Sequence, residues 1–172
     1  MKKLLWVLAS AGLYLSLGVG ILVAAEFIPK YEKADFLLVM KSERKLYLYT
    51  DSEVLRSFDI ALGLIPEGAK QREGDFRTPE GRYQLSTKNP NSNYFLSIQI
   101  SYPDARDIER ARAANVSPGG QIMIHGYPNE PKYSESIYQT WDWTDGCVAV
   151  SNSDMVDIWL MTDSETLIEI RP

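Results

Sequence analysis

The residues best suited to covalent chemistry are the only cysteine, Cys147, and the only histidine, His125, of this 172-residue chain. A thiol with an ordinary pKa of about 8.5 is mostly protonated at neutral pH, and a neighbouring imidazole is the usual base that generates the attacking thiolate. The pair therefore predicts nucleophilic attack on a carbonyl. The alternative is structural, with Cys147 as a small buried hydrophobe and His125 as a satisfied polar residue.

The turn before the cysteine contributes further chemistry. Gly146 has no Cβ, so a substrate carbonyl can approach the sulfur, and the amides of Gly146 and Cys147 are expected to point at the developing oxyanion. The hydroxyl of Thr144 is expected to hold this turn by bonding to the backbone. As an alternative, Asp145-Gly146 is also a common hairpin dipeptide.

The imidazole of His125 needs an acceptor on its second nitrogen, and the sequence offers a backbone carbonyl or Asp145. The aromatic side chains between His125 and Cys147 predict either a lid or ordinary packing: Tyr127, Tyr133, Tyr138, Trp141 and Trp143. One His and one Cys argue against a zinc site, and no cofactor-binding motif is found. The net charge of −5 argues against nucleic-acid binding.

The N-terminus predicts a membrane segment, with Lys2 and Lys3 followed by residues 4–25 that carry no charge. As a helix this run is roughly 33 Å long, enough to cross a bilayer core of about 30 Å. Residues 1–26 are therefore expected to be a signal anchor, with cleavage after Val23-Ala24-Ala25 as the alternative. Either way, the positive-inside rule places the rest of the chain on the far side of the membrane.

A single domain, residues 35–171, is expected to position Cys147 and His125. Its sequence pattern predicts a mainly β fold. Apolar and alternating runs predict strands at 34–40, 45–49, 54–62, 81–87, 95–102, 121–126 and 166–170. The first three suit an antiparallel meander, and residues 63–81 suit a loop with turns. Helices are expected at 103–114, with Pro103 at the first helical position, and at 153–161, capped by Asn152 or Ser153. The pattern favours a β-sandwich or barrel with two or three short helices, with His125 and Cys147 at one rim of the sheet.

These motifs resemble a known family. His125-Gly126, followed after 17 residues by Thr144-x-Gly146-Cys147, resembles the signature of the YkuD-type L,D-transpeptidases, as does Gly63 with the later segment Arg77-Thr78-Pro79-Glu80-Gly81. The resemblance implies an L,D-transpeptidase-like β-sandwich or barrel, with Cys147 as nucleophile and His125 as its base. It also implies an oxyanion hole at the Gly146-Cys147 turn, with Thr144, Asp145 and Gly126 in support. The implied substrates are peptidoglycan stem peptides in the bacterial periplasm or at the outer face of the cytoplasmic membrane, without a cofactor.

Three departures from the family pattern refine this expectation. Asp145 replaces the usual His, Ala149 stands where many members have Arg, and the 18-residue gap between His125 and Thr144 is slightly long. The Asp-Gly-Cys form is similar to a YafK-like branch, which implies release of peptidoglycan-linked lipoprotein by hydrolysis as well as cross-linking. Weak substrate contacts are expected from Arg77, Tyr127 and Trp143, and the charge of the missing Arg is sought at Arg77, Arg82, Lys70 and Lys132.

Two other functions stay open on the sequence. A general cysteine peptidase shares the Cys/His logic, although papain-like enzymes place the cysteine before the histidine. A membrane-anchored, non-catalytic peptidoglycan-binding module needs no reactive thiol, so labelling of Cys147 by an alkylating reagent discriminates it from an enzyme.

Overall fold

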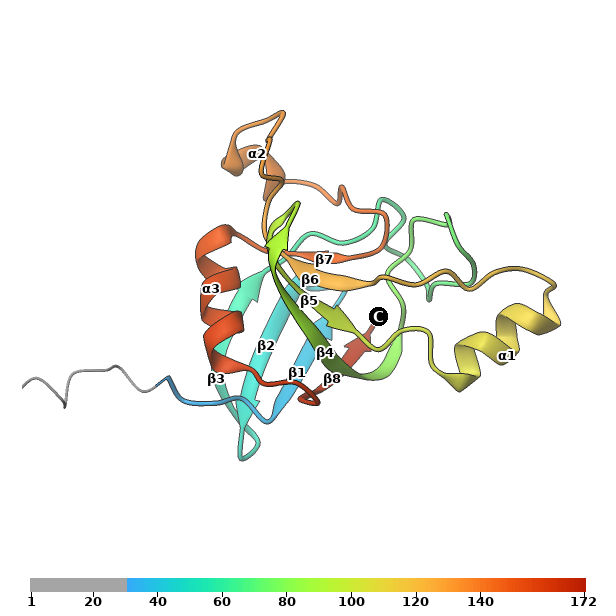
Figure 1. Cartoon of the computed structure of the whole chain (residues 1–172), viewed down its shortest axis with the longest axis horizontal. Coiled ribbons are helices and arrows are strands. Elements are labelled where there is room, and N and C mark those ends of the chain that lie inside the picture. Colours follow the sequence, from blue (N-terminus) through green and yellow to red (C-terminus); the bar gives the residue numbers. More distant parts are fainter. Residues whose placement is uncertain (1–30) are drawn as a thin grey trace, which may run out of the picture. The chain divides into compact units, whose positions relative to one another are not determined.

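The structure, a computed structural model, describes residues 31–172. This part of the chain contains eight strands and three helices (Figure 1). The predicted anchor or signal peptide, residues 1–26, lies outside the described residues. Between residues 31 and 172, no helix has both the length and the apolar character that a bilayer crossing requires.

The strands form one mixed sheet in the order β3-β2-β1-β8-β4-β5-β6-β7. Their bounds are Phe36–Met40 (β1), Lys45–Thr50 (β2), Glu53–Asp59 (β3), Gly81–Ser92 (β4), Phe95–Ile100 (β5), Met123–His125 (β6), Val148–Ala149 (β7) and Leu167–Arg171 (β8). The predicted antiparallel meander is confirmed as β1–β3. The last strand, β8, returns between β1 and β4 and runs parallel to β1. The prediction of a mainly β fold with few helices is confirmed.

The two ends of the sheet approach each other. The chain continues after β3 as residues 60–62, which were expected to extend that strand, and instead crosses to the other end of the sheet. There Ala61 and Ala149 of β7 exchange two backbone hydrogen bonds of 2.8 Å. Next to them, Leu64 donates to the carbonyl of Thr144 at 3.0 Å. Strand β7 therefore has hydrogen-bonded neighbours on both sides, although it is only two residues long.

The helices are α1 (Ala105–Ala113), α2 (Glu135–Tyr138) and α3 (Asn152–Met161), and their starts differ from the predictions. Helix α1 begins after Asp104 rather than at Pro103, because the Asp104 carboxylate accepts the amides of Arg106 and Asp107 and completes a capping box. Helix α3 is capped by Ser151, and not by Asn152 or Ser153. The short α2 lies in the segment that was expected to be a lid or packing.

The hydrophobic core consists of the alternate, inward-facing apolar side chains of the strands and the apolar side of α3. Leu37, Leu46 and Ile98 are fully buried, and Met155 and Ile158 of α3 belong to the same cluster. The loop of residues 63–81 is held against the sheet by the buried Lys41, whose ammonium group bonds the Glu80 carboxylate at 2.7 Å and the carbonyl of Gly68 at 2.8 Å. This loop reaches the β6–β7 end of the sheet and supports the candidate site.

Candidate active site

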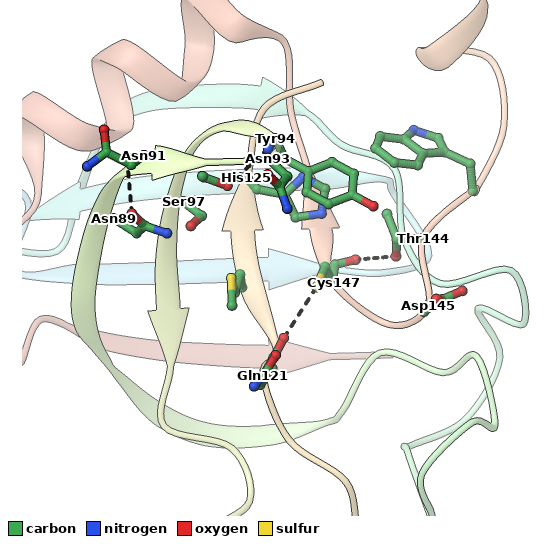
Figure 2. Close-up of a pocket in the computed structure, with 13 residues that line it drawn as sticks. Asn89, Asn91, Asn93, Tyr94, Ser97, Gln121, His125, Thr144, Asp145 and Cys147 are labelled. Atoms are coloured by element: carbon green, nitrogen blue, oxygen red, sulfur yellow. Dashed lines mark hydrogen bonds between the residues drawn. The ribbon is translucent and has the colours of Figure 1, made fainter. Parts of the chain in front are cut away.

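Strand register brings His125 and Cys147 together. Strands β6 and β7 are parallel, with Ile124 opposite Val148 and His125 opposite Ala149, so that Cys147, one residue before β7, aligns with Met123. Since alternate residues of a strand point to the same face, Cys147, Met123 and His125 share one face of the sheet. All three line a cleft of about 460 Å³ (Figure 2).

Among the residues that the structure describes, the rest of the cleft wall is uncharged except for Asp145 at one rim. A transverse row of side chains runs across the sheet, because Ser97 of β5 pairs with Asn89 of β4 on one side and with His125 on the other. In Figure 2, Asn89 and Asn91 lie at one end of the cleft and Thr144 and Asp145 at the other. The lining residues that sequence reasoning missed are Asn89, Asn91, Ser92, Asn93, Tyr94, Ser97, Gln121 and Met123. The register of β4–β6 is the signal that would have found the strand residues among them.

The thiol of Cys147 is protonated at rest. Burial raises its pKa above the ordinary value, and the nearby Asp145 carboxylate raises it further, whereas a backbone hydrogen bond from Met123 and the charge of Lys70 act in the opposite direction. The thiol donates to the carbonyl of Gln121 at 3.6 Å (Figure 2). Both burial and this hydrogen bond favour the neutral form of the thiol.

The imidazole of His125 is neutral and oriented by the backbone. Its Nδ1 lies 2.7 Å from the carbonyl oxygen of Gly126. Since a carbonyl oxygen can only accept a hydrogen bond, Nδ1 carries the proton. Of the two orienting groups that the sequence offered, the structure has the backbone carbonyl rather than Asp145. This tautomer leaves Nε2 without a hydrogen and able to accept one. Burial lowers the pKa of His125 to about 4, against the weaker raising effect of the Gly126 hydrogen bond.

Aromatic rings enclose the imidazole. The ring of Tyr94 lies 4.6 Å from that of His125, centroid to centroid, and the ring of Trp143 lies 5.6 Å away. Tyr138 of α2 packs edge-on against Trp143 at 5.0 Å and stacks on Tyr127 at 5.4 Å. The segment between His125 and Cys147 is therefore anchored by its aromatic side chains, and the imidazole is buried.

The turn before Cys147 has a special backbone. Gly146 has a φ of 130°, and a Cβ there would lie 2.6 Å from the carbonyl oxygen of Arg77. Thr144 holds the turn as predicted, since its hydroxyl accepts the Gly146 amide at 3.1 Å and donates to the Cys147 carbonyl at 2.8 Å. The Gly146 amide was expected to face an oxyanion, but in the structure it is bonded to Thr144.

The predicted substrate contacts separate into two groups. Trp143 lines the cleft, whereas Tyr127 is buried beneath Tyr138 and is not part of the cleft wall. The four cations considered for carboxylate binding lie outside the wall as well: Arg77, Arg82, Lys70 and Lys132. Lys70 is instead buried in an ion pair with Asp75 at 2.8 Å. In residues 31–172, His, Cys, Asp and Glu side chains form no group of three that could hold a metal ion.

A family model and a related protein sequence both match this chain, and both name an L,D-transpeptidase. The family model of YkuD, the L,D-transpeptidase catalytic domain, matches residues 34–170. Over 97 residues the chain is 36% identical to the "Putative L,D-transpeptidase YafK" of Escherichia coli K12, a match that covers 53% of this chain and 37% of that protein. The resemblance predicted from the motifs is thereby confirmed.

Solved structures show the same fold. The helical cell shape determining protein Pgp2 from Campylobacter jejuni has a TM-score of 0.58 and 27% identity, over 79% of this chain and 46% of that one. An L,D-transpeptidase from Mycobacterium smegmatis has a TM-score of 0.53 at 13% identity, over 80% of this chain and 58% of that one, which is a likeness of fold alone. This chain spans less than two thirds of the length of each of these relatives.

Proposed function

This chain belongs to the YkuD family of L,D-transpeptidase catalytic domains, and we propose that it catalyses cysteine-dependent acyl transfer on peptidoglycan stem peptides. One observation carries the proposal. The β6–β7 register places Cys147 and a His125 whose Nε2 has no hydrogen on one face of the sheet, in one cleft. The catalytic domain is residues 35–171.

The proposed reaction starts from a neutral pair rather than an ion pair, because burial raises the pKa of Cys147 and lowers that of His125. Nε2 of His125 takes the thiol proton as the sulfur attacks the carbonyl carbon of the third, diamino-acid residue of the stem peptide. The tetrahedral intermediate collapses to a thioester, and the imidazolium gives its proton to the departing amine. An amine then resolves the thioester to a cross-link, or water resolves it to a free acid.

The Cys147 amide is the proposed oxyanion donor. It has no acceptor within residues 31–172, whereas the Gly146 amide is bonded to the hydroxyl of Thr144. A donor of this kind stabilises the intermediate by about 3 kcal/mol. In this proposal Gly146 and Thr144 shape the turn, and they do not contact the oxyanion.

The charge of the cleft favours hydrolysis over cross-linking. No Lys or Arg belongs to the described cleft wall, and the exposed Asp145 lies at its rim, so a donor with a free terminal carboxylate is not neutralised there. A donor whose leaving group is an uncharged amide link, as in peptidoglycan-linked lipoprotein, meets no such penalty. We expect the full-length protein to release bound lipoprotein from sacculi faster than it joins two tetrapeptide muropeptides. Efficient cross-linking without lipoprotein release would reverse this preference.

The mass of the intact protein tests the covalent chemistry. After incubation with muropeptides or lipoprotein-bearing sacculi, the wild type is expected to carry an acyl adduct on Cys147. The Cys147→Ala variant is expected to fold, to carry no adduct and to be inactive. Activity of that variant would mean that the reaction does not use the thiol. A wild type with neither adduct nor activity would favour the non-catalytic wall-binding module. An adduct formed from unrelated peptides alone would favour a general cysteine peptidase.

We also propose that residues 4–25, outside the described part, anchor the domain at the outer face of the cytoplasmic membrane. Retention of the full-length protein in membranes washed with alkaline carbonate, together with digestion by a protease added to spheroplasts, is the expected result. Release by the wash at a mass lacking the N-terminal residues would mean a cleaved signal peptide.

A further inference from the structure

The peptide bond between Gly126 and Tyr127 has both of its polar groups engaged at the candidate site. Its carbonyl oxygen accepts the Nδ1 hydrogen of His125 at 2.7 Å, and its N–H donates to Oδ1 of Asn152 at 2.8 Å. These two groups belong to one planar unit, so the direction of the N–H fixes the direction of the carbonyl.

We infer that Asn152 is a positioning residue for His125, acting through the Gly126–Tyr127 peptide. By holding the N–H, it points the carbonyl at the imidazole and keeps the hydrogen on Nδ1. Nε2 is then available to the thiol of Cys147. This inference rests on the proposed role of His125 as the base.

The side chain of Asn152 has no capping duty at its own helix. Ser151 is the N-cap of α3, and its hydroxyl accepts the amide of Asp154 at 3.1 Å. Asn152 is the first residue of the helix, and its amide group reaches across to the end of β6 instead. The helix start is therefore specified without Asn152, which separates a role in stability from a role in positioning.

Gly126 is fitted to this contact. A Cβ at Gly126 would lie 2.5 Å from Oδ1 of Asn152 and 3.0 Å from Cβ of Phe95. The close approach of Asn152 to the peptide therefore needs glycine at this position. Any side chain at 126 displaces either the Asn152 oxygen or the strand that carries Phe95.

Loss of the acceptor has a defined consequence. Without Oδ1 the Tyr127 amide, on a residue that is buried, is left without its partner, and a buried donor of this kind drives the peptide to rotate. Rotation takes the carbonyl away from Nδ1. The imidazole then also populates the tautomer with the hydrogen on Nε2, which cannot accept the thiol proton.

The single histidine makes the tautomer measurable, because the full-length protein labelled with ¹⁵N-histidine gives the signals of His125 alone. We expect the wild type to show the Nδ1-protonated form at pH 7. The Asn152→Ala variant is expected to show a mixture of tautomers and to be alkylated at Cys147 about 10-fold to 100-fold more slowly. Asn152→Asp keeps the acceptor oxygen and suits a helix N-terminus, so it is expected to restore both readouts.

Two further variants distinguish a positioning role of Asn152 from a general loss of stability. Ser151→Ala removes the cap of α3 and is expected to lower the melting temperature while leaving the tautomer and the alkylation rate unchanged. Gly126→Ala is expected to reproduce the tautomer mixture of Asn152→Ala from the other side of the contact. An unchanged tautomer and rate in Asn152→Ala overturn the inference, as does a change of equal size in Ser151→Ala.

His125→Gln separates this inference from the proposed function. If His125→Gln leaves the alkylation rate at pH 7 unchanged, the coupling of His125 to Cys147 fails, and the tautomer of Asn152→Ala still decides whether Asn152 orients the imidazole. If His125→Gln slows alkylation and Asn152→Ala does not, the proposed function stands and the positioning role of Asn152 fails.

Discussion

At the scale of single residues, one cleft holds a thiol and an imidazole that are both neutral at rest. Many cysteine enzymes instead hold a preformed thiolate and imidazolium, which requires a polar surrounding for both charges. Here burial acts on both groups in the direction of neutrality. In the proposed mechanism, proton transfer therefore has to accompany the attack on the substrate.

If His125 is the base, as proposed, its neutrality sets the acid limit of activity. Protonation of Nε2 removes the base, and since the pKa of His125 is about 4, kcat/KM is expected to fall only as the pH approaches 4. The rate of Cys147 alkylation between pH 3.5 and 8 checks this without any substrate. An acid limb near the ordinary histidine pKa of about 6.5 would contradict it.

The same lowered pKa links stability to pH. Between about pH 4 and pH 6.5 the unfolded chain binds a proton at His125 that the folded chain does not. The free energy of unfolding therefore rises with pH in this window, and falls as the pH is lowered through it. The slope is at most about 1.4 kcal/mol per pH unit. Urea titrations of wild type and His125→Gln over this range measure the difference. Parallel curves for the two proteins would mean that His125 titrates normally in the fold.

At the scale of elements, the turn before β7 depends on the backbone of one glycine. Gly146→Ala forces a side chain into a φ of 130° and against the Arg77 carbonyl, so we expect a loss of about 2 to 4 kcal/mol in stability and of most activity. Gly74→Ala is the matched control, because Gly74 also has a positive φ, 71°, but open space where the Cβ would lie. It is expected to cost only about 1 to 2 kcal/mol. Equal losses in chemical denaturation would remove the clash from the explanation.

The sequence predicted those elements whose cause is local. Alternation along β1 and β2 is visible in the residues themselves, and Cys147 and His125 stand out because each type occurs once. The caps at Asp104 and Ser151 were missed because several neighbouring residues can cap a helix, and the sequence alone does not select one. At α3 the side chain of Asn152 is taken up by a tertiary contact with the Tyr127 amide, which leaves the cap to Ser151. Asn89 and Ser97 were missed because their place beside His125 is a matter of strand register, which pairs residues far apart in the chain.

At the scale of the whole molecule, the loop of residues 63–81 joins the meander to the candidate site through Lys41. Lys41→Met leaves the Glu80 carboxylate and the carbonyls of Gly68 and Thr78 without their donor, and is expected to cost on the order of 3 kcal/mol. The exposed pair of Lys33 and Asp163 is the matched control, and Lys33→Met is expected to change stability by less than about 1 kcal/mol. Thermal unfolding of the two variants side by side gives the comparison. A mild effect of Lys41→Met would mean that the loop is held by its other contacts.

The protonation state of the Cys147 thiol also determines how fast the protein reacts with oxidants. Peroxides react with thiolates, and the path from sulfenic to sulfonic acid begins only where the sulfur is ionised and accessible. In the folded chain burial and the Gln121 carbonyl keep this sulfur protonated, while an unfolded chain exposes a thiol of ordinary acidity. The protonated state of the sulfur in the fold thus also slows irreversible oxidation of the chain's only cysteine.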